Sequence, residues 1–116
     1  MVNTAARKAL SKVGCSVAFQ YPKHFLNLPV ISFYTVREQG SLSCDNEEAF
    51  RDGTIAVDVW AKTPAECANI AVRASAALID DGWMRIFEMD VPCGSGDVYH
   101  RTLRFIKSFD MNSQEE

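Results

Sequence analysis

The strongest constraint on the fold is a helix start that follows directly after an alternating strand. Thr63 suits an N-cap, Pro64 stands at the first helical position, and Glu66 completes a capping box in which its carboxylate reaches back to the Thr63 amide. The predicted helix runs to about Asp80 and stops at Gly82. Its inward stripe consists of small and apolar residues at helical spacing, namely Cys67, Ile70, Ala71, Ala74 and Leu78.

The remaining pattern predicts a second, shorter helix and five strands. Apolar residues at helical spacing indicate a helix over residues 4–13, and Gly14 is suited to end it. Strands are expected at residues 15–21, 30–39, 53–61, 83–91 and 98–107. The polar, acidic stretch 40–52 has no clear period and is interpreted as a long loop between the second and third strands.

This order, α-β-β-β-α-β-β, predicts an α+β fold with a mostly antiparallel sheet of about five strands and both helices packed on one face. The chain has 116 residues, which suits one domain, and we expect that domain to span residues 1–109. The polar residues 110–116 are expected to form a flexible tail.

Composition excludes several classes of function. The net charge is -3, so no strong attraction to nucleic acid is expected. No apolar run reaches the roughly 20 residues that cross a bilayer, and the first residues show no secretory signal. We therefore expect no membrane partner and a cytoplasmic location. Four widely spaced cysteines without a metal-ligand spacing favour reduced thiols over a disulfide framework or a zinc site.

The sequence contains no convincing catalytic or cofactor motif. Cys93, His100 and Asp97 can be arranged as a nucleophile, a base and an orienting group, but nothing supplies an oxyanion hole for them. The glycine-rich turn 93–97 lacks the phosphate-loop pattern and joins two strands. The acidic loop does not match the calcium-loop pattern. We expect no enzyme activity, no cofactor and no metal site.

Apolar side chains exceed what one sheet face and one helix stripe can bury. The predicted helix 64–80 carries a second stripe, rotated by roughly 120° from the first, made of Ala68, Val72, Ala76 and Ile79. Three explanations stay open for it: contact with the first helix of the same chain, burial against a neighbouring subunit, or plain exposure of small residues.

The predicted sheet shows a similar surplus. Ile31 and Phe33 lie on one face of their strand, whereas Tyr34 lies on the other, and Trp60 lies opposite the face of Val57. A sheet covered by helices on one side normally has a polar second side. The surplus indicates either a covered second face or single apolar residues scattered over the surface.

Taken together, the chain resembles the small tail-completion proteins of long-tailed bacteriophages and prophages, which are related in fold to tail terminators. The resemblance covers roughly residues 5 to 106. Its most specific parts are the stretch DVWAKTPAEC at residues 58–67 and the strand YHRTLRF at residues 99–105. Weaker parts are the short first helix, the LPVISF strand start at residues 28–33 and the acidic Asp45-Asn46-Glu47.

The resemblance implies a non-enzymatic virion subunit without a cofactor. It implies a ring, expected to be a hexamer, that ends the tail tube at its head-proximal end and joins it to the head connector. The partners would be copies of the chain itself, the tail-tube protein and the head-tail connector protein. The chain would lie in the virion tail, and in the host cytoplasm during assembly. DNA would pass through the lumen without being read.

A ring needs two different patches that meet head to tail. We expect these patches to be the second helix stripe and the exposed sheet face, with the acidic loop facing a basic residue of the neighbour. The expected interface residues are Tyr34, Asp45, Glu47, Glu48, Trp60, Val72, Ile79, Arg101 and Arg104. On this hypothesis, Val72→Asp or Trp60→Asp lowers the assembled mass and leaves the monomer folded.

The alternatives are another head-tail joining or minor tail component, a dimeric ligand-binding α+β module, or a small enzyme that uses Cys93.

Overall fold

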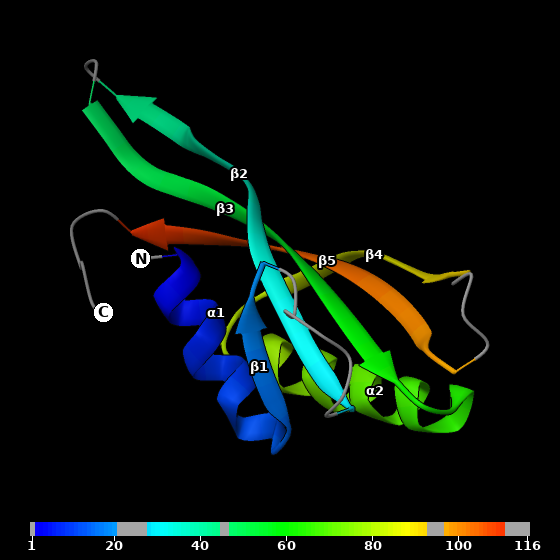
Figure 1. Cartoon of the computed structure of the whole chain (residues 1–116). Helices are drawn as coiled ribbons and strands as arrows, with labels where there is room; N and C mark the ends of the chain where they lie inside the picture. Colours follow the sequence, from blue (N-terminus) through cyan, green and yellow to red (C-terminus); the bar gives the residue numbers. More distant parts are fainter. Residues whose placement is uncertain (1, 21–27, 45–46, 93–96, 111–116) are drawn as a thin grey trace.

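The computed structural model describes residues 2–20, 28–44, 47–92 and 97–110. It confirms the predicted fold class and element order, with five strands in one sheet and two helices (Figure 1). The elements in chain order are α1 (Val2–Leu10), the 3-10 turn η1 (Ser11–Val13), β1 (Ser16–Phe19), β2 (Val30–Cys44), β3 (Glu47–Ala61), α2 (Pro64–Asp80), β4 (Met84–Val91) and β5 (Tyr99–Asp110).

The sheet has the strand order β1-β2-β3-β5-β4. All neighbouring pairs are antiparallel except β1 and β2, which run parallel with Ser16 opposite Val30. The sheet is therefore mixed, with β1 and β4 as its two edges. β5 includes Asp110, so the strand runs one residue into the expected tail, and residues 111–116 lie outside the described part.

The first helix ends where the sequence predicts, because Gly14 adopts φ 92 in the left-handed region that glycine tolerates best. Its last turn is a 3-10 turn, and the helix proper starts two residues before the expected position. The buried stripe of α1 joins the core through Val2, Ala6, Ala9 and Leu10.

The second helix begins at the predicted cap, with one change in its hydrogen bonding. The Glu66 amide donates to the Thr63 hydroxyl at 3.1 Å, as expected. The Glu66 carboxylate, however, accepts from the Lys62 amide at 3.3 Å, one residue before the amide that the capping box predicts. All five residues of the predicted inward stripe are buried.

Removing this cap gives a first testable prediction. Thr63→Ala leaves the Glu66 amide without its side-chain acceptor, so we expect the free energy of unfolding to fall by about 1 kcal/mol. Urea denaturation followed by circular dichroism measures the change. Thr63→Ser keeps the hydroxyl and serves as the control. An equal loss in both variants would contradict the assigned role of the hydroxyl.

The interpretation as a loop is wrong for residues 40–44 and 47–52, and residues 45–46 of the expected loop lie outside the described part. These two stretches continue β2 and β3 as paired strands, with Gln39 opposite Asp52 and Cys44 opposite Glu47. The register shifts at three places in the pair, between Thr35 and Arg37 and on both sides of Leu42. Each shift moves the alternation by one residue, which explains why the sequence shows no clear period there.

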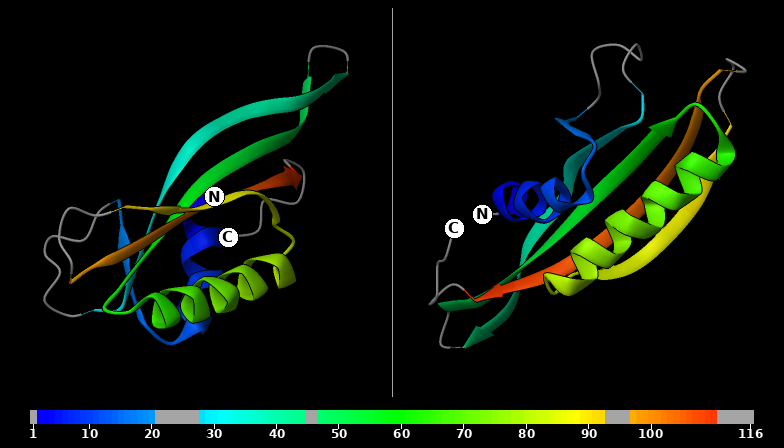
Figure 2. Two further views of the ribbon diagram at one scale, coloured as in Figure 1. Left: turned by 90° about the vertical axis from the view of Figure 1, so that its right-hand side faces the viewer. Right: turned by 90° about the horizontal axis from the view of Figure 1, so that it is seen from below.

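Both helices pack on one face of the sheet, so one core fills the space between the layers (Figure 2). Strand residues with no exposed surface form its centre, among them Ile55, Val57, Leu103 and Phe105. Leu78 of α2 and Leu10 of α1 reach them from the helix layer. The opposite side of the sheet carries no described helix and is called the open face below.

Candidate functional site

A buried polar cluster lies on the open face, where the sequence predicts an exposed tryptophan. His100 Nε2 lies 2.7 Å from Asp58 Oδ1, and both side chains are almost fully buried. The Trp60 ring stacks on the His100 ring, with centroids 3.7 Å apart and planes 14° apart. Trp60 Nε1 donates to the hydroxyl of Ser32 at 3.0 Å. β2, β3 and β5 each contribute to this cluster because their side chains on one face are directly opposite one another.

The expectation that Trp60 is exposed is therefore wrong. Its side chain is only 8% exposed, because His100 covers one face of the ring and the indole nitrogen is turned toward Ser32. Trp60→Asp would place a carboxylate in this cluster and disturb the monomer, so it no longer tests assembly. The sequence alone does not show that Trp60 lies beside His100, because this cross-strand pair depends on the register of β3 and β5.

The candidate catalytic trio cannot be placed as a unit, because Cys93 lies outside the described residues. Of the other members, His100 contacts Asp58 and the Trp60 ring. Among the described residues, no three His, Cys, Asp or Glu side chains are placed to hold a metal ion. None of the described helices is long and apolar enough to cross a bilayer.

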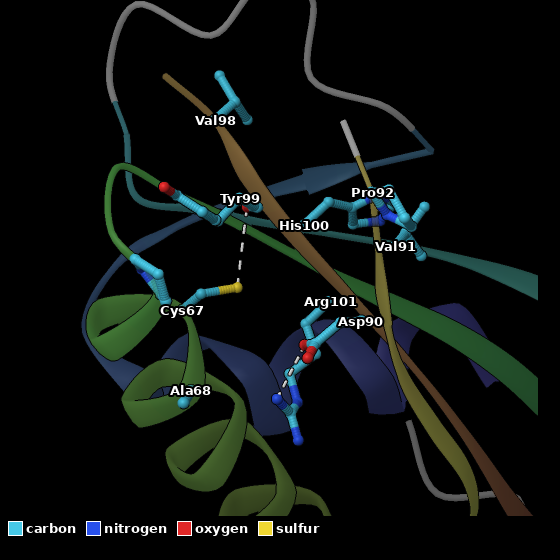
Figure 3. Close-up of a pocket in the computed structure, with 10 residues that line it drawn as sticks. Cys67, Ala68, Asp90, Val91, Pro92, Val98, Tyr99, His100 and Arg101 are labelled. Carbon is cyan, nitrogen blue, oxygen red and sulfur yellow. Dashed lines mark hydrogen bonds and ion pairs between the residues drawn. The ribbon is translucent and has the colours of Figure 1, made fainter. Parts of the chain in front are cut away.

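A pocket of about 630 Å³ opens between the start of α2 and the far end of the β4–β5 pair (Figure 3). Its lining is mostly apolar, with Arg101 and Asp90 joined by an ion pair on one side. The Cys67 thiol in its wall donates to the backbone oxygens of Val59, at 3.5 Å, and Tyr99, at 3.8 Å. The thiol is thus buried and held by hydrogen bonds, which suits a structural cysteine more than a nucleophile.

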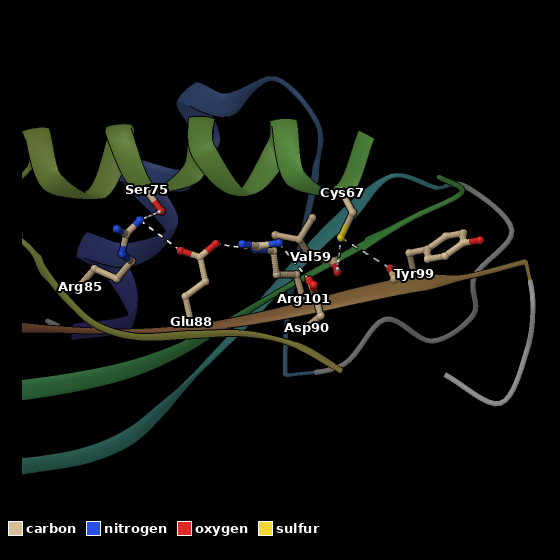
Figure 4. Close-up of polar contacts among 8 residues, drawn as sticks. All are labelled: Val59, Cys67, Ser75, Arg85, Glu88, Asp90, Tyr99 and Arg101. Atoms are coloured by element: carbon tan, nitrogen blue, oxygen red, sulfur yellow. Dashed lines mark hydrogen bonds and ion pairs between the residues drawn. The ribbon is translucent and has the colours of Figure 1, made fainter. Parts of the chain in front are cut away.

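A chain of charged side chains fills the space between α2 and β4 (Figure 4). Glu88 accepts from Arg101 Nε at 2.5 Å and pairs with Arg85 at 3.2 Å. Asp90 binds the other end of the Arg101 guanidinium at 2.9 Å. The hydrogen bond that Arg101 donates to Glu88 raises the pKa of Arg101 above its usual value, so this side chain stays charged.

This network changes the role expected for Arg101. Its guanidinium is held by two carboxylates of its own chain, so it is not placed to face the acidic stretch of a neighbour. Arg104 lies on the open face and is exposed. Tyr34 is half-buried on the same face. Asp45 lies outside the described residues, and Glu47 and Glu48 are described only by their backbone positions in β3.

The second stripe of α2 is exposed where its large side chains lie. Val72 is 68% exposed and Ile79 is 52% exposed, so α1 does not cover them. This outcome removes the explanation that the stripe packs against the first helix of the same chain. Val72 and Ile79 therefore form an exposed apolar surface on α2, which is called the α2 strip below.

A second apolar surface, which the sequence pattern does not predict, lies along the edge strand β4. We call it the β4 patch; its members are the exposed residues Met84, Ile86, Phe87 and Met89. Alternation in β4 would be expected to turn apolar residues toward the helices. The structure does the reverse, because Arg85, Glu88 and Asp90 lie on the side of β4 that carries the helices and form the charged network there. A register shift between Arg85 and Phe87 adds an unpaired residue at Ile86.

The β4 patch and the α2 strip are two different surfaces of the protomer, since the patch belongs to an edge strand of the sheet and the strip belongs to a helix that covers one face of that sheet. Such a pair of surfaces is the arrangement that a head-to-tail contact requires. Single exposed apolar residues are common, whereas four on one edge strand form a candidate contact surface.

No protein-family model matches the sequence, and no curated protein is similar to it by sequence. The fold does recur in solved structures. One similar chain belongs to a structure described as "Virion of native gene transfer agent (GTA) particle". The two chains superpose with a TM-score of 0.60 over 92% of each chain, at 16% sequence identity. This chain therefore has the fold of a virion protein of a gene transfer agent particle.

Proposed function

We propose that the chain is a structural subunit of a phage-like virion, and within it a tail-completion or terminator protein. Copies form a ring, expected to be a hexamer, at the head-proximal end of the tail tube. The ring ends tube growth and binds the head-tail connector. The observation that carries the proposal is the shared fold with a chain of a gene transfer agent virion, which spans nearly the whole length of both chains.

The surface of the protomer supports an assembly role. The α2 strip and the β4 patch are both exposed, and they belong to different elements of the protomer. In a ring, the β4 patch of one copy covers the α2 strip of the next, and the same contact repeats around the axis. The buried polar groups stabilise the protomer, since His100 pairs with Asp58 and Arg101 pairs with Glu88. The subunit is accordingly non-enzymatic.

Sedimentation velocity tests the proposal with the purified chain, alone and mixed with a tail-tube protein. We expect one closed species of about six copies, either alone or templated by the tube. Electron microscopy of tubes grown in the presence of the chain should show a narrow length distribution and a cap at one end.

Two results would overturn the proposal. One is a chain that stays monomeric under both conditions and leaves tube length unchanged. The other is a stable dimer whose melting temperature rises with a small ligand, because that behaviour fits the ligand-binding alternative.

A further inference from the structure

Charge is strongly segregated along the first half of the chain. Residues 1–37 contain five basic side chains and no acidic one; the five are Arg7, Lys8, Lys12, Lys23 and Arg37. Residues 38–52 contain five acidic side chains and one basic one; the acidic ones are Glu38, Asp45, Glu47, Glu48 and Asp52. The fold separates these two segments, because the first forms α1, β1 and the start of β2, whereas the second forms the long β2–β3 hairpin.

The basic segment borders an open groove between α1 and the β1–β2 edge of the sheet. The groove has a volume of about 690 Å³ and is lined by Asn3, Thr4, Arg7, Lys8, Ser11, Phe19 and Phe33. Phe19 is 44% exposed and meets Phe33 edge to face, with centroids 5.6 Å apart. The Arg7 guanidinium lies 5.6 Å from the centre of the Phe33 ring. The groove thus has aromatic side chains in its wall and basic side chains at its rim.

No acidic side chain balances this rim. None of the groove residues is acidic, and within the described part of the chain Arg7, Lys8 and Lys12 form no ion pair. Lys8 is exposed on α1, and Lys12 is exposed on η1 next to the groove residue Ser11. Carboxylates of a partner would therefore find three basic side chains at this surface with which to form ion pairs.

The acidic segment forms an arm, defined here as residues 38–44 of β2 with residues 47–52 of β3. The two strands of the arm pair with each other, from Gln39 opposite Asp52 to Cys44 opposite Glu47. Glu38 lies opposite Gly53 at the root of the arm. On its other side β3 pairs with β5 only from Phe50 onward, so the described end of the arm extends past the sheet (Figure 1). The molecule measures 54 × 24 × 23 Å, which reflects this extension.

The arm is fixed at its root and directed away from its own α1. The Thr35 hydroxyl donates to the Asn3 side chain at 2.5 Å, which ties β2 to the start of α1. At Gly53 a Cβ atom would lie only 2.6 Å from a methyl group of Val2, so the backbone of β3 presses directly on the same helix. From this root the ladder continues away from α1 (Figure 1). The arm is therefore presented to another molecule.

We propose that the arm of one copy docks in the α1 groove of the next copy. In this contact the acidic residues at positions 47 and 48 of the arm meet Arg7, Lys8 and Lys12 of the neighbour. The inference rests on the proposed ring and names the contact that orients it. The occupant is a second copy because the chain itself carries both halves of the complementary charge pattern.

The contact fits the head-to-tail geometry of the ring. The copy that presents its open face also presents its arm, since both belong to the sheet. Both acceptor surfaces involve the helix layer, since the α2 strip lies on one helix and α1 borders the groove. Arg101 is excluded as the acceptor of the arm, because Glu88 and Asp90 already bind it.

Charge reversal on each side tests the contact. The first variant is Glu47→Lys with Glu48→Lys, and the second is Lys8→Glu with Lys12→Glu. We expect each variant alone to sediment as a monomer at concentrations where the wild type assembles, with association weakened at least about tenfold. An equimolar mixture should recover the assembly, because each reversed arm then meets a reversed groove. A chain that carries all four substitutions should also recover it.

The controls separate this inference from the proposed ring. Lys62→Glu reverses one exposed charge outside the groove and should assemble like the wild type. Arg104→Glu tests the rival acceptor on the open face and should not be rescued by the reversed arm. Circular dichroism confirms that each variant is folded. If wild type and Lys62→Glu assemble but neither the mixture nor the fourfold variant does, the arm contact is wrong and the ring stands. If wild type fails to assemble even with the tube protein, both are wrong.

Discussion

Asp58→Ala is expected to lower the free energy of unfolding by about 3 kcal/mol, a large part of the stability of a domain of this size. The Asp58 side chain is 5% exposed, and its carboxylate is the partner of His100 at 2.7 Å. Alanine leaves the His100 nitrogen without that acceptor in a site that water hardly reaches. The loss should extend to Trp60, because the indole ring stacks on the imidazole whose position Asp58 fixes.

Urea denaturation measures this effect, with tryptophan fluorescence as a probe of the stacked ring. Asp58→Asn is the matched control, since its amide oxygen can still accept from His100; we expect it to cost about 1 kcal/mol. Ser32→Ala removes only the acceptor of the Trp60 indole and should cost about 1 kcal/mol as well. If Asp58→Ala and Asp58→Asn are equally stable, the hydrogen bond between Asp58 and His100 does not contribute to the free energy of unfolding.

The helix layer could be predicted from sequence because its signals are local. The Thr63 cap, the buried stripe from Cys67 to Leu78 and the left-handed Gly14 each depend on residues within a few positions of one another. Local signals survive without knowledge of the partner strand. The same holds for the alternation of residues 55–59, whose inward side chains the structure buries.

The open face could not be predicted because its arrangement depends on register. Trp60 is buried only because β5 places His100 directly opposite it. β4 turns its charged residues toward α2 only because Arg101 of β5 lies there to pair with Glu88. The arm was interpreted as a loop because register shifts near Leu42 interrupt its alternation. Each case combines residues from distant parts of the chain, which no periodicity within one strand encodes.

Phe87→Asp is expected to abolish self-assembly and leave the protomer folded. Phe87 is 45% exposed in the β4 patch, opposite Arg104 of β5 on the open face. A carboxylate there costs little in a free protomer, since water still reaches it. In an assembly it would be buried among Met84, Met89 and the partner surface, where an unpaired charge is unfavourable. We expect association to weaken by about 30-fold or more, as for a central interface residue.

Sedimentation velocity at several concentrations gives the association constant, and thermal unfolding gives the stability of the same samples. Ala65→Asp is the control, because it adds the same charge at an exposed position in the first turn of α2, where acidic residues are favourable. Val72→Asp places the charge on the α2 strip, so it should weaken assembly as Phe87→Asp does if the α2 strip meets the β4 patch. Normal assembly of Phe87→Asp with loss in Val72→Asp would mean that the helix strip contacts another surface. Normal assembly of both would mean that neither apolar surface is covered, and the exposed side chains would then be those of an ordinary monomer.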